Sequence, residues 1–140
     1  MANSIINCAT ESSVGYSAGI VIDSTNALVQ SNITANNSTY GIRALKEGSE
    51  ITYNDSYGNL ENFNGFSPDT SNISENPLFV TGPKGNFYLS QILAGQTEES
   101  PCVNRGPAPA SDYGLDIRTT RTDGVNDDGT VDMGYHYKIK

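Results

Sequence analysis

The stretch GIVIDSTNALVQSN, residues 19–32, is followed at an offset of 22 residues by GIRALKEGSEITYN, residues 41–54, and this pair decides the fold. Glycine and isoleucine open both copies, and asparagine closes both at the same position. An earlier, partial copy lies in SIINCAT, where Asn7 takes the place of Asn32 and Asn54, three residues further back. Self-similarity at such a period indicates a repeat architecture in which each copy is one structural unit.

Each copy contains short alternating apolar runs, and no stretch keeps a helical apolar period. The runs are Ile20 with Ile22, Leu28 with Val29, Ile42 with Ala44, and Ile51 with Tyr53. A unit of this size with two or three short strands and intervening turns is typical of one coil of a parallel β-helix. The sequence therefore predicts an all-β parallel β-helix. A β-sandwich is the alternative, since it also uses many short strands joined by turns.

The predicted coils place the recurrent asparagines at a corner of the stack. Asn7, Asn32 and Asn54 would lie one above another, where amide side chains bond along the stack and satisfy the turn backbone. The 140 residues suit a single domain, with β-helix coils over residues 1–57. The register ends after Tyr57, and residues 58–140 are expected to form an irregular coil and a loop-rich C-terminal cap, with the second half covering one end of the stack.

Composition excludes some partners. The formal net charge is −8, which disfavours nucleic acid because such binding depends on neutralising phosphates. The sequence contains no stretch of about 20 apolar residues, so no membrane span is predicted. The N-terminus lacks the basic and apolar regions of a signal peptide. A first coil with an uncovered edge would invite strand pairing. We therefore expect either an upstream β-helix region or end-to-end self-association.

Four motifs in the second half carry a resemblance: NPLFV at 76–80, GNFYLS at 85–90, SPCVNRG at 100–106 and GTVDMGYHY at 129–137. In this order they resemble the C-terminal region of bacterial secreted right-handed parallel β-helix repeat proteins. The departures are Asn104 and Arg105 where Asp and Ala are usual, and His136 where Glu is usual. The last motif and the residues after it are expected to form a closing alternating strand.

The resemblance implies a right-handed β-helix and an extracellular or cell-surface location. Some of these proteins are polysaccharide lyases or glycoside hydrolases, whose catalytic bases and calcium-binding acids lie on central coils, and no residue here matches those positions. We therefore expect a non-catalytic structural or carbohydrate-associated module, with polysaccharide as a candidate partner. The alternatives are a fragment of a polysaccharide lyase or glycoside hydrolase, and a self-assembling extracellular filament subunit.

The acidic loop TDGVNDDGTVD, residues 122–132, is a candidate Ca²⁺ site. It is not an EF-hand, because Gly124 stands where the first Asp ligand is required and Tyr135 where the twelfth-position Glu is required. A looser site would take its oxygens from Asp123, Asn126, Asp128 and Asp132. The alternative is a loop in which aspartates accept hydrogen bonds from turn backbone groups.

The sequence assigns no catalytic residue. Arg43 and Lys46, with Asp23 one coil below, would line a groove or simply form the solvated outer face. The lone His136 alternates with tyrosines and is expected to be a packed or surface side chain. The candidates for stacking on sugar rings are Tyr40, Tyr53, Tyr57 and Tyr88. The alternative is that aromatic side chains, Tyr40 and Tyr53 among them, pack beneath the turns. Cys8 and Cys102 form either one disulfide or two buried thiols.

Overall fold

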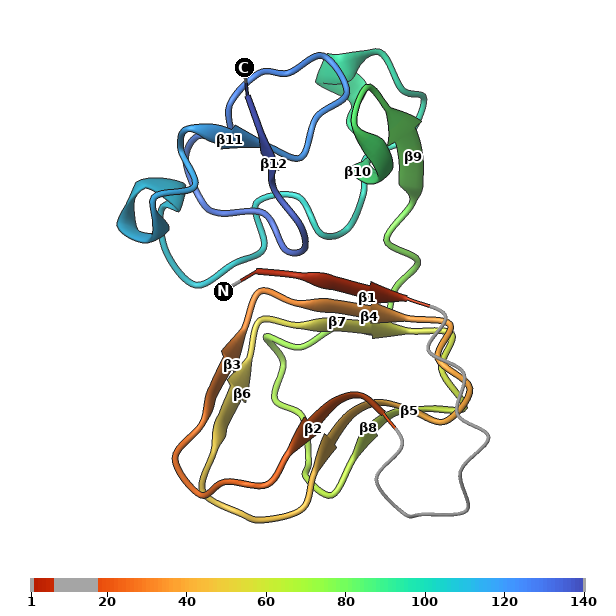
Figure 1. The fold of residues 1–140 in the computed structure, drawn as a ribbon, viewed down its shortest axis with the longest axis vertical. Coiled ribbons are helices and arrows are strands. Elements are labelled where there is room, and N and C mark those ends of the chain that lie inside the picture. The colour runs from red at the N-terminus through yellow and green to blue at the C-terminus, as the bar shows by residue number, and fades with distance from the viewer. Residues whose placement is uncertain (1, 7–17, 140) are drawn as a thin grey trace.

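The computed structural model describes residues 2–6 and 18–139, so Asn7 and Cys8 lie outside the described residues. The chain is all-β, as the sequence predicts, with parallel sheets in its first half and two short antiparallel pairs in its second. Figure 1 shows the two halves as separate layers, the stacked strands below and the loop-rich C-terminal region above. Among the described residues, no helix has the length and apolar character needed to cross a membrane.

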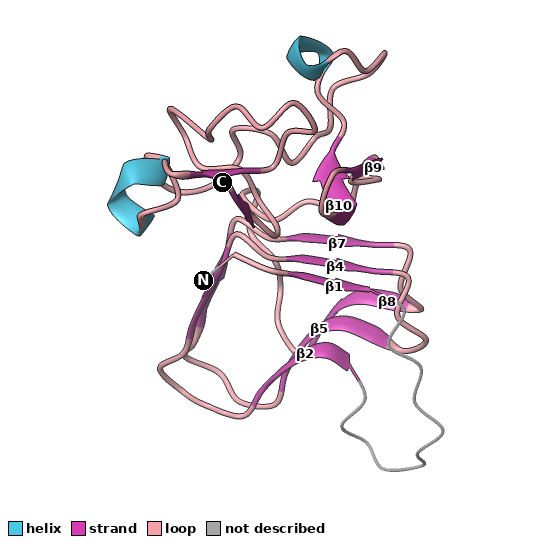
Figure 2. Cartoon of the chain, turned by 45° about the horizontal axis from the view of Figure 1, so that its top comes forward, coloured by secondary structure: helices cyan, strands magenta, loops and turns pink. Residues whose placement is uncertain are grey.

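Three parallel sheets form the first half, and each takes strands from successive passes of the chain (Figure 2). The first contains β1 (Ser4–Ile6), β4 (Ile33–Ala35) and β7 (Asp55–Tyr57). The second contains β2 (Ala18–Ile22), β5 (Tyr40–Ala44) and β8 (Glu61–Asn64), and the third β3 (Leu28–Gln30) and β6 (Glu50–Thr52). Paired residues of β2 and β5, β3 and β6, and β4 and β7 are 22 positions apart, the offset of the sequence copies.

The stack continues beyond Tyr57, where the sequence pattern fades. β8 pairs with β5 at an offset of 21 residues, and Ile73 adds a single parallel bridge to Asp55. The segment that we expected to be an irregular connection therefore supplies the last strands of the stack. The shorter offsets explain why the repeat is hard to see there, because a loop that loses residues shifts every later match out of register.

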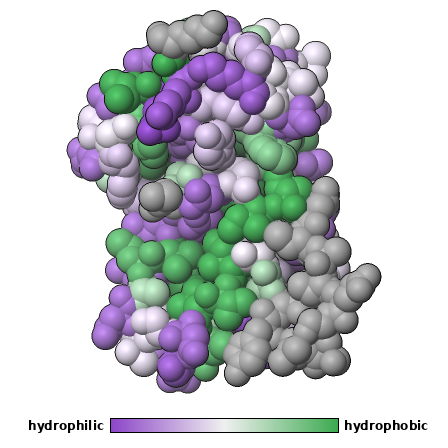
Figure 3. All heavy atoms as spheres, viewed as in Figure 1, coloured by the Kyte–Doolittle hydropathy of each residue, from purple (hydrophilic) through white to green (hydrophobic). Residues whose placement is uncertain are grey.

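Apolar side chains from all three passes fill the space between the sheets. The buried core contains Ile22, Ile42, Ala44 and Ile51. Phe63 and Phe66 pack against this core and meet each other edge to face, with ring centroids 5.7 Å apart. In Figure 3 one end of the stack faces the viewer, and hydrophobic residues gather at the centre of that end. Gly41 sits at a close approach between strands, because a Cβ there would lie 1.9 Å from Ser56 Oγ.

The corners of the stack use left-handed backbone at repeated positions. Ser31 and Tyr53, 22 positions apart, have φ values of 57° and 55°, and Asn36 and Gly58, also 22 apart, have 54° and 64°. Such a conformation costs a tyrosine about 1–2 kcal/mol. Tyr53 is held there by hydrogen bonds, since Ser31 N donates to Tyr53 O and Tyr53 N donates to Ser71 Oγ, both at 2.9 Å.

We expected the C-terminal region to cover one end of the stack. It packs on the flank of the stack instead. Figure 1 places it against the sheet that contains β1, β4 and β7. Ile33 of β4 is fully buried under Leu89, Cys102 and Met133, which makes a second core between the two layers. The physical reason is that the apolar side chain of Ile33 lies on the outer face of this sheet. Burial of that side chain requires a covering layer.

The region itself has little regular structure. It contains the antiparallel pair β9 (Phe79–Gly82) and β10 (Gly85–Leu89), the pair β11 (Arg118–Thr119) and β12 (Tyr137–Lys138), and the 3₁₀ turns η1 (Ile92–Ala94) and η2 (Ala110–Tyr113). The prediction of an alternating closing strand at the C-terminus is wrong, apart from the two residues of β12. Residues 131–134 are all buried, because both sides of this segment are covered.

Candidate functional site

A ladder of asparagine side chains runs along one corner of the stack. Each Nδ2 donates to the Oδ1 of the next residue in the series Asn3, Asn32, Asn54 and Asn72, at 3.3, 3.1 and 3.2 Å. The Oδ1 of Asn54 also accepts from Asn32 N, and the Nδ2 of Asn54 donates to Thr52 O. The predicted ladder residues Asn32 and Asn54 are thus in direct contact. The position beside Asn32 is held by Asn3, while Asn7 lies outside the described residues.

A second amide ladder, which the sequence analysis missed, runs along another corner. Asn37 Nδ2 donates to Asn59 Oδ1 at 2.8 Å, and Asn59 Nδ2 donates to Asn62 Oδ1 at 3.1 Å. The 22-residue offset between Asn37 and Asn59 was the available signal. These ladders satisfy buried backbone groups, which would otherwise cost about 1–3 kcal/mol each. Their role is architectural, so the functional site lies elsewhere.

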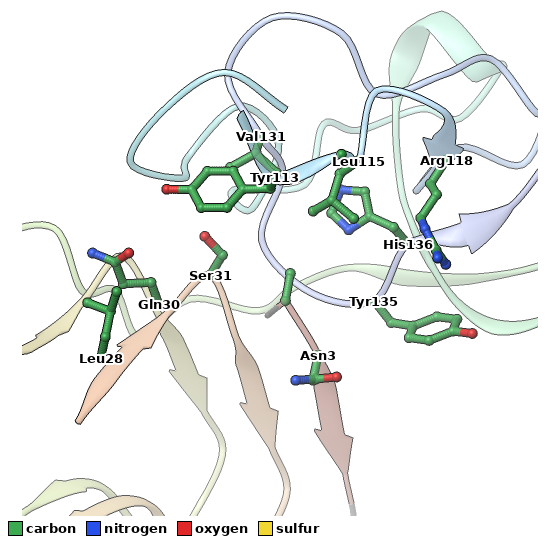
Figure 4. A pocket seen from close by; sticks show the side chains of 12 residues that line it. Asn3, Leu28, Gln30, Ser31, Tyr113, Leu115, Arg118, Val131, Tyr135 and His136 are labelled. Carbon is green, nitrogen blue, oxygen red and sulfur yellow. The ribbon is translucent and has the colours of Figure 1, made fainter. Parts of the chain in front are cut away.

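The candidate site is a cleft of about 450 Å³ between the corner of the stack and the C-terminal region. Figure 4 shows Leu28, Gln30 and Ser31 on the side of the stack, with Asn3 beside them. The opposite wall comes from η2 and from the segments that follow it, and carries Tyr113, Leu115, Arg118, Val131, Tyr135 and His136. The volume lies in the range of small-ligand sites in proteins.

Two tyrosines give this cleft accessible aromatic surface. Tyr113 is 46% exposed and Tyr135 is 43% exposed. The ring of Tyr135 packs edge to face on Tyr137 at 4.8 Å between centroids, and Tyr137 stacks on Tyr88 at 4.1 Å. Tyr135 is therefore supported from behind by two further rings, which limits its movement and leaves surface available to a ligand.

His136 forms part of the cleft wall but is held by internal hydrogen bonds. Its Nδ1 lies 3.0 Å from Gly134 O and its Nε2 lies 2.7 Å from Asp127 Oδ2. A carbonyl oxygen only accepts, so Nδ1 carries a hydrogen. Asp127 Oδ2 also accepts from Asp132 N at 3.0 Å. With both ring nitrogens engaged, His136 has no free lone pair to offer as a general base to a molecule in the cleft.

Asp132 joins the same buried network behind the cleft. Its carboxylate accepts hydrogen bonds from Thr120 Oγ1, from Gln91 Nε2 and from Asn104 N. Burial raises the pKa of Asp132 to about 6, and the neighbouring charge of Asp127 adds to the rise. The network ties the segments after β10, Cys102 and β11 to the closing segment, and it holds the cleft wall in place.

A second buried carboxyl group lies between the two layers. Asp55 of β7 accepts from Glu75 N at 3.1 Å and from the thiol of Cys102 at 3.3 Å. Burial raises the pKa of Asp55 to about 7. Burial also raises the pKa of the Cys102 thiol, with a further rise from Asp55. Cys102 is a free buried thiol and contributes packing to the second core.

The structure does not bring the four predicted calcium ligands together. Asp123 pairs with Arg121 at 2.6 Å, Asn126 Nδ2 donates to Asp116 O at 2.7 Å, and Asp132 is buried. Asp128 is exposed. Within residues 2–6 and 18–139, no group of three or more His, Cys, Asp or Glu side chains is arranged to hold a metal ion. The acidic loop is arranged mainly around hydrogen bonds to its own turns.

The other residues considered from the sequence lie away from this cleft. Lys46 pairs with Asp23 at 2.7 Å on the exposed outer surface, and Arg43 lies over the ring of Tyr40 at 4.7 Å. Tyr53 packs against the second core. None of the four tyrosines proposed for sugar stacking lines the cleft, whose tyrosines are Tyr113 and Tyr135. No local pattern marks these two, because the cleft forms only when the C-terminal region folds back onto the stack.

No protein-family model, curated protein or solved structure matches the chain.

Proposed function

We propose that this chain is a non-catalytic carbohydrate-binding module with a parallel β-helix architecture, and that it belongs to an extracellular or cell-surface protein. The observation that carries the proposal is the cleft between stack and C-terminal region, where two accessible tyrosines lie near amide side chains. The location is inferred from the motif resemblance described above.

The architecture is supported by the repeated passes of the chain. Each pass contributes one strand to each of several parallel sheets, and the core lies between the sheets. Left-handed residues recur at the corners at the repeat offset, and amide ladders follow the same corners. Stacked units of this kind bury a continuous core that none of them could bury alone.

Carbohydrate is the ligand class that fits the cleft's chemistry. Sugar rings present C–H faces that pack on aromatic side chains, and hydroxyl groups that exchange hydrogen bonds with amides. Tyr113 and Tyr135 supply the first kind of contact, and Asn3 and Gln30 lie at the cleft for the second. A non-catalytic role is supported by the lining residues that the structure describes, none of which is a carboxylate for glycoside hydrolysis.

The proposal is tested by titrating the purified chain with soluble oligosaccharides in a calorimeter. Binding should fall at least about fivefold in Tyr113→Ala, since truncating an aromatic anchor typically costs more than about 1 kcal/mol. Tyr113→Phe keeps the ring face and should bind nearly as the wild type does. A ligand that binds equally to wild type and Tyr113→Ala would place the site elsewhere and contradict the proposal.

A self-assembling subunit is the second candidate, and the apolar end of the stack favours it. Hydrophobic residues gather at that end in Figure 3, and Leu28 of the outer strand β3 is 64% exposed. Light scattering over a hundredfold range of concentration tests this, because end-to-end association must increase the average mass with concentration. A constant monomer mass would rule it out.

A further inference from the structure

The cleft differs in charge from the rest of the molecule. The chain has 16 Asp and Glu residues and a net charge of −8, yet none of the described residues that line the cleft is acidic. One lining residue, Arg118 of β11, carries a permanent positive charge. A region without carboxylates around a guanidinium has a more positive potential than the surface around it.

Arg118 also differs from two other basic residues of the chain in its contacts. Arg121 and Lys46 each pair with an aspartate. Across the described part of the chain, by contrast, the Arg118 guanidinium makes no ion pair or side-chain hydrogen bond, although the residue is half-buried. Figure 4 shows its side chain directed into the cleft above Tyr135. A half-buried guanidinium with unused donors loses hydration that an anionic ligand would replace.

We propose that the saccharide bound in this cleft carries an acidic group, and that Arg118 binds it. A carboxylate and a sulfate share the chemistry that matters, because each offers oxygen pairs that match the planar fork of guanidinium donors. This inference rests on the proposed carbohydrate-binding function and narrows its ligand class. The sugar ring packs on Tyr135, which lies next to Arg118, and Tyr113 contacts the other end of the ligand.

The surroundings of Arg118 support this assignment. The carboxylate of Asp127 is buried behind the cleft wall, and its Oδ2 already accepts from Asp132 N and contacts His136 Nε2. Asp127 also donates its backbone N–H to Arg118 O at 2.8 Å, so the backbone of Arg118 is fixed while its side chain is available. The charge of Arg118 is therefore available to a ligand.

The experiment compares three probes of similar length by calorimetry with the whole chain. The probes are a galacturonate oligosaccharide, the neutral galactose oligosaccharide and a sulfated galactose oligosaccharide. At least one acidic probe should bind about tenfold tighter than the neutral one, and the advantage should shrink as salt is raised. The tighter of the two acidic probes identifies the source of the anionic group.

Variants then assign the effect to this residue. Arg118→Gln should lower the affinity for the acidic probe to that for the neutral probe. Arg118→Lys should keep part of the difference between these two affinities, since Lys supplies charge without the planar fork. Arg105→Gln is the matched control, because Arg105 is exposed and does not line the cleft. Melting temperatures of the variants should agree, which separates lost binding from lost folding.

The outcomes distinguish this inference from the function on which it rests. Equal affinity for neutral and acidic probes, lost in Tyr113→Ala, would overturn the inference and leave carbohydrate binding in place. An acidic preference that survives in Arg118→Gln would also overturn it, since another group would then bind the anion. Failure of all three probes to bind would contradict both the inference and the proposed function.

Discussion

The stacked strands and the C-terminal region are held together in different ways. In the stack, the same contact recurs at a fixed offset, so Asn32 binds Asn54 as Asn37 binds Asn59. In the C-terminal region each contact occurs once and joins distant positions, as His136 does with Asp127. Repetition lets many weak, similar contacts define a structure, whereas a single-copy arrangement depends on a few buried groups. Four substitutions test this contrast, from the largest expected effect to the smallest.

Asn54→Ala should be the most damaging, because it interrupts a repeated contact in the middle of the stack. Asn54 is fully buried, accepts from Asn32 and donates to Val29 O, Thr52 O and Asn72. Leaving several buried groups unsatisfied should lower the free energy of unfolding by at least about 4 kcal/mol. Urea unfolding measures this. Asn26→Ala, on the exposed surface, is the control, and equal effects of the two would show that the ladder does not stabilise the stack.

Met133→Ala should loosen the contact between the two layers. Met133 is fully buried in the second core with Ile33 and Leu89. We expect a loss of about 3 kcal/mol, as for other large-to-small core changes. Hydrogen exchange should increase first at Gly134 N, which donates across the interface to Ser31 O, and later in β5. Leu93→Ala, at an 80% exposed position, is the control. Uniform loss of protection would mean that the two layers unfold as one unit.

Asp55→Asn should stabilise the chain at alkaline pH. Burial raises the pKa of Asp55 from 3.8 to about 7, so the folded state favours the protonated carboxyl. Its contribution to stability is fully present below about pH 4 and is lost as the pH rises through 7. The shift corresponds to at most about 4 kcal/mol, and we expect about 2 kcal/mol of it at pH 8, because the new amide must find acceptors.

The test compares unfolding of wild type and Asp55→Asn at pH 4.5 and pH 8. The advantage of the variant should be large at pH 8 and small at pH 4.5. Asp132, whose pKa is raised to about 6, is present in both proteins, so its effect cancels in the difference. A stability difference that does not change with pH would show that Asp55 does not titrate in this range.

Asp123→Ala should change stability least. The carboxylate pairs with Arg121 at 2.6 Å near the surface, and such pairs contribute less than about 1 kcal/mol. We also expect Ca²⁺ to leave the melting temperature of both proteins unchanged, because the predicted ligands do not converge. A clear rise with Ca²⁺ in the wild type that disappears in Asp123→Ala would restore the calcium site as a working hypothesis.

The same contrast explains how far the sequence could be interpreted. The 22-residue copies predicted the pairing of β2 with β5 and of β3 with β6, because repeated contacts leave a repeated pattern. The first pass escaped the pattern, since Ser4 pairs with Ile33 at an offset of 29 residues. The motif NPLFV overlaps the start of β9 and the motif GNFYLS contains β10, and these two strands pair with each other.

The cleft could not be predicted from the sequence. Tyr113, Arg118 and Tyr135 share no local spacing, and Leu28 and Gln30 reach the same cleft from a strand far away in the chain. The acidic loop misled for a related reason. Its aspartates are close in sequence, but Asp132 is turned into the interior by Gln91 and Thr120, while Asp123 is turned outward to Arg121.

The amide ladders have a consequence for the length of the stack. Each inner asparagine accepts through Oδ1 from one neighbour and donates through Nδ2 to the next, so every inner rung makes the same pair of contacts. The contacts within such a ladder do not fix the number of its rungs. Duplication of residues 23–44 in the gene would lengthen the stack by one pass without changing its cross-section. The height of the stack is thus a quantity that genetic duplication can change.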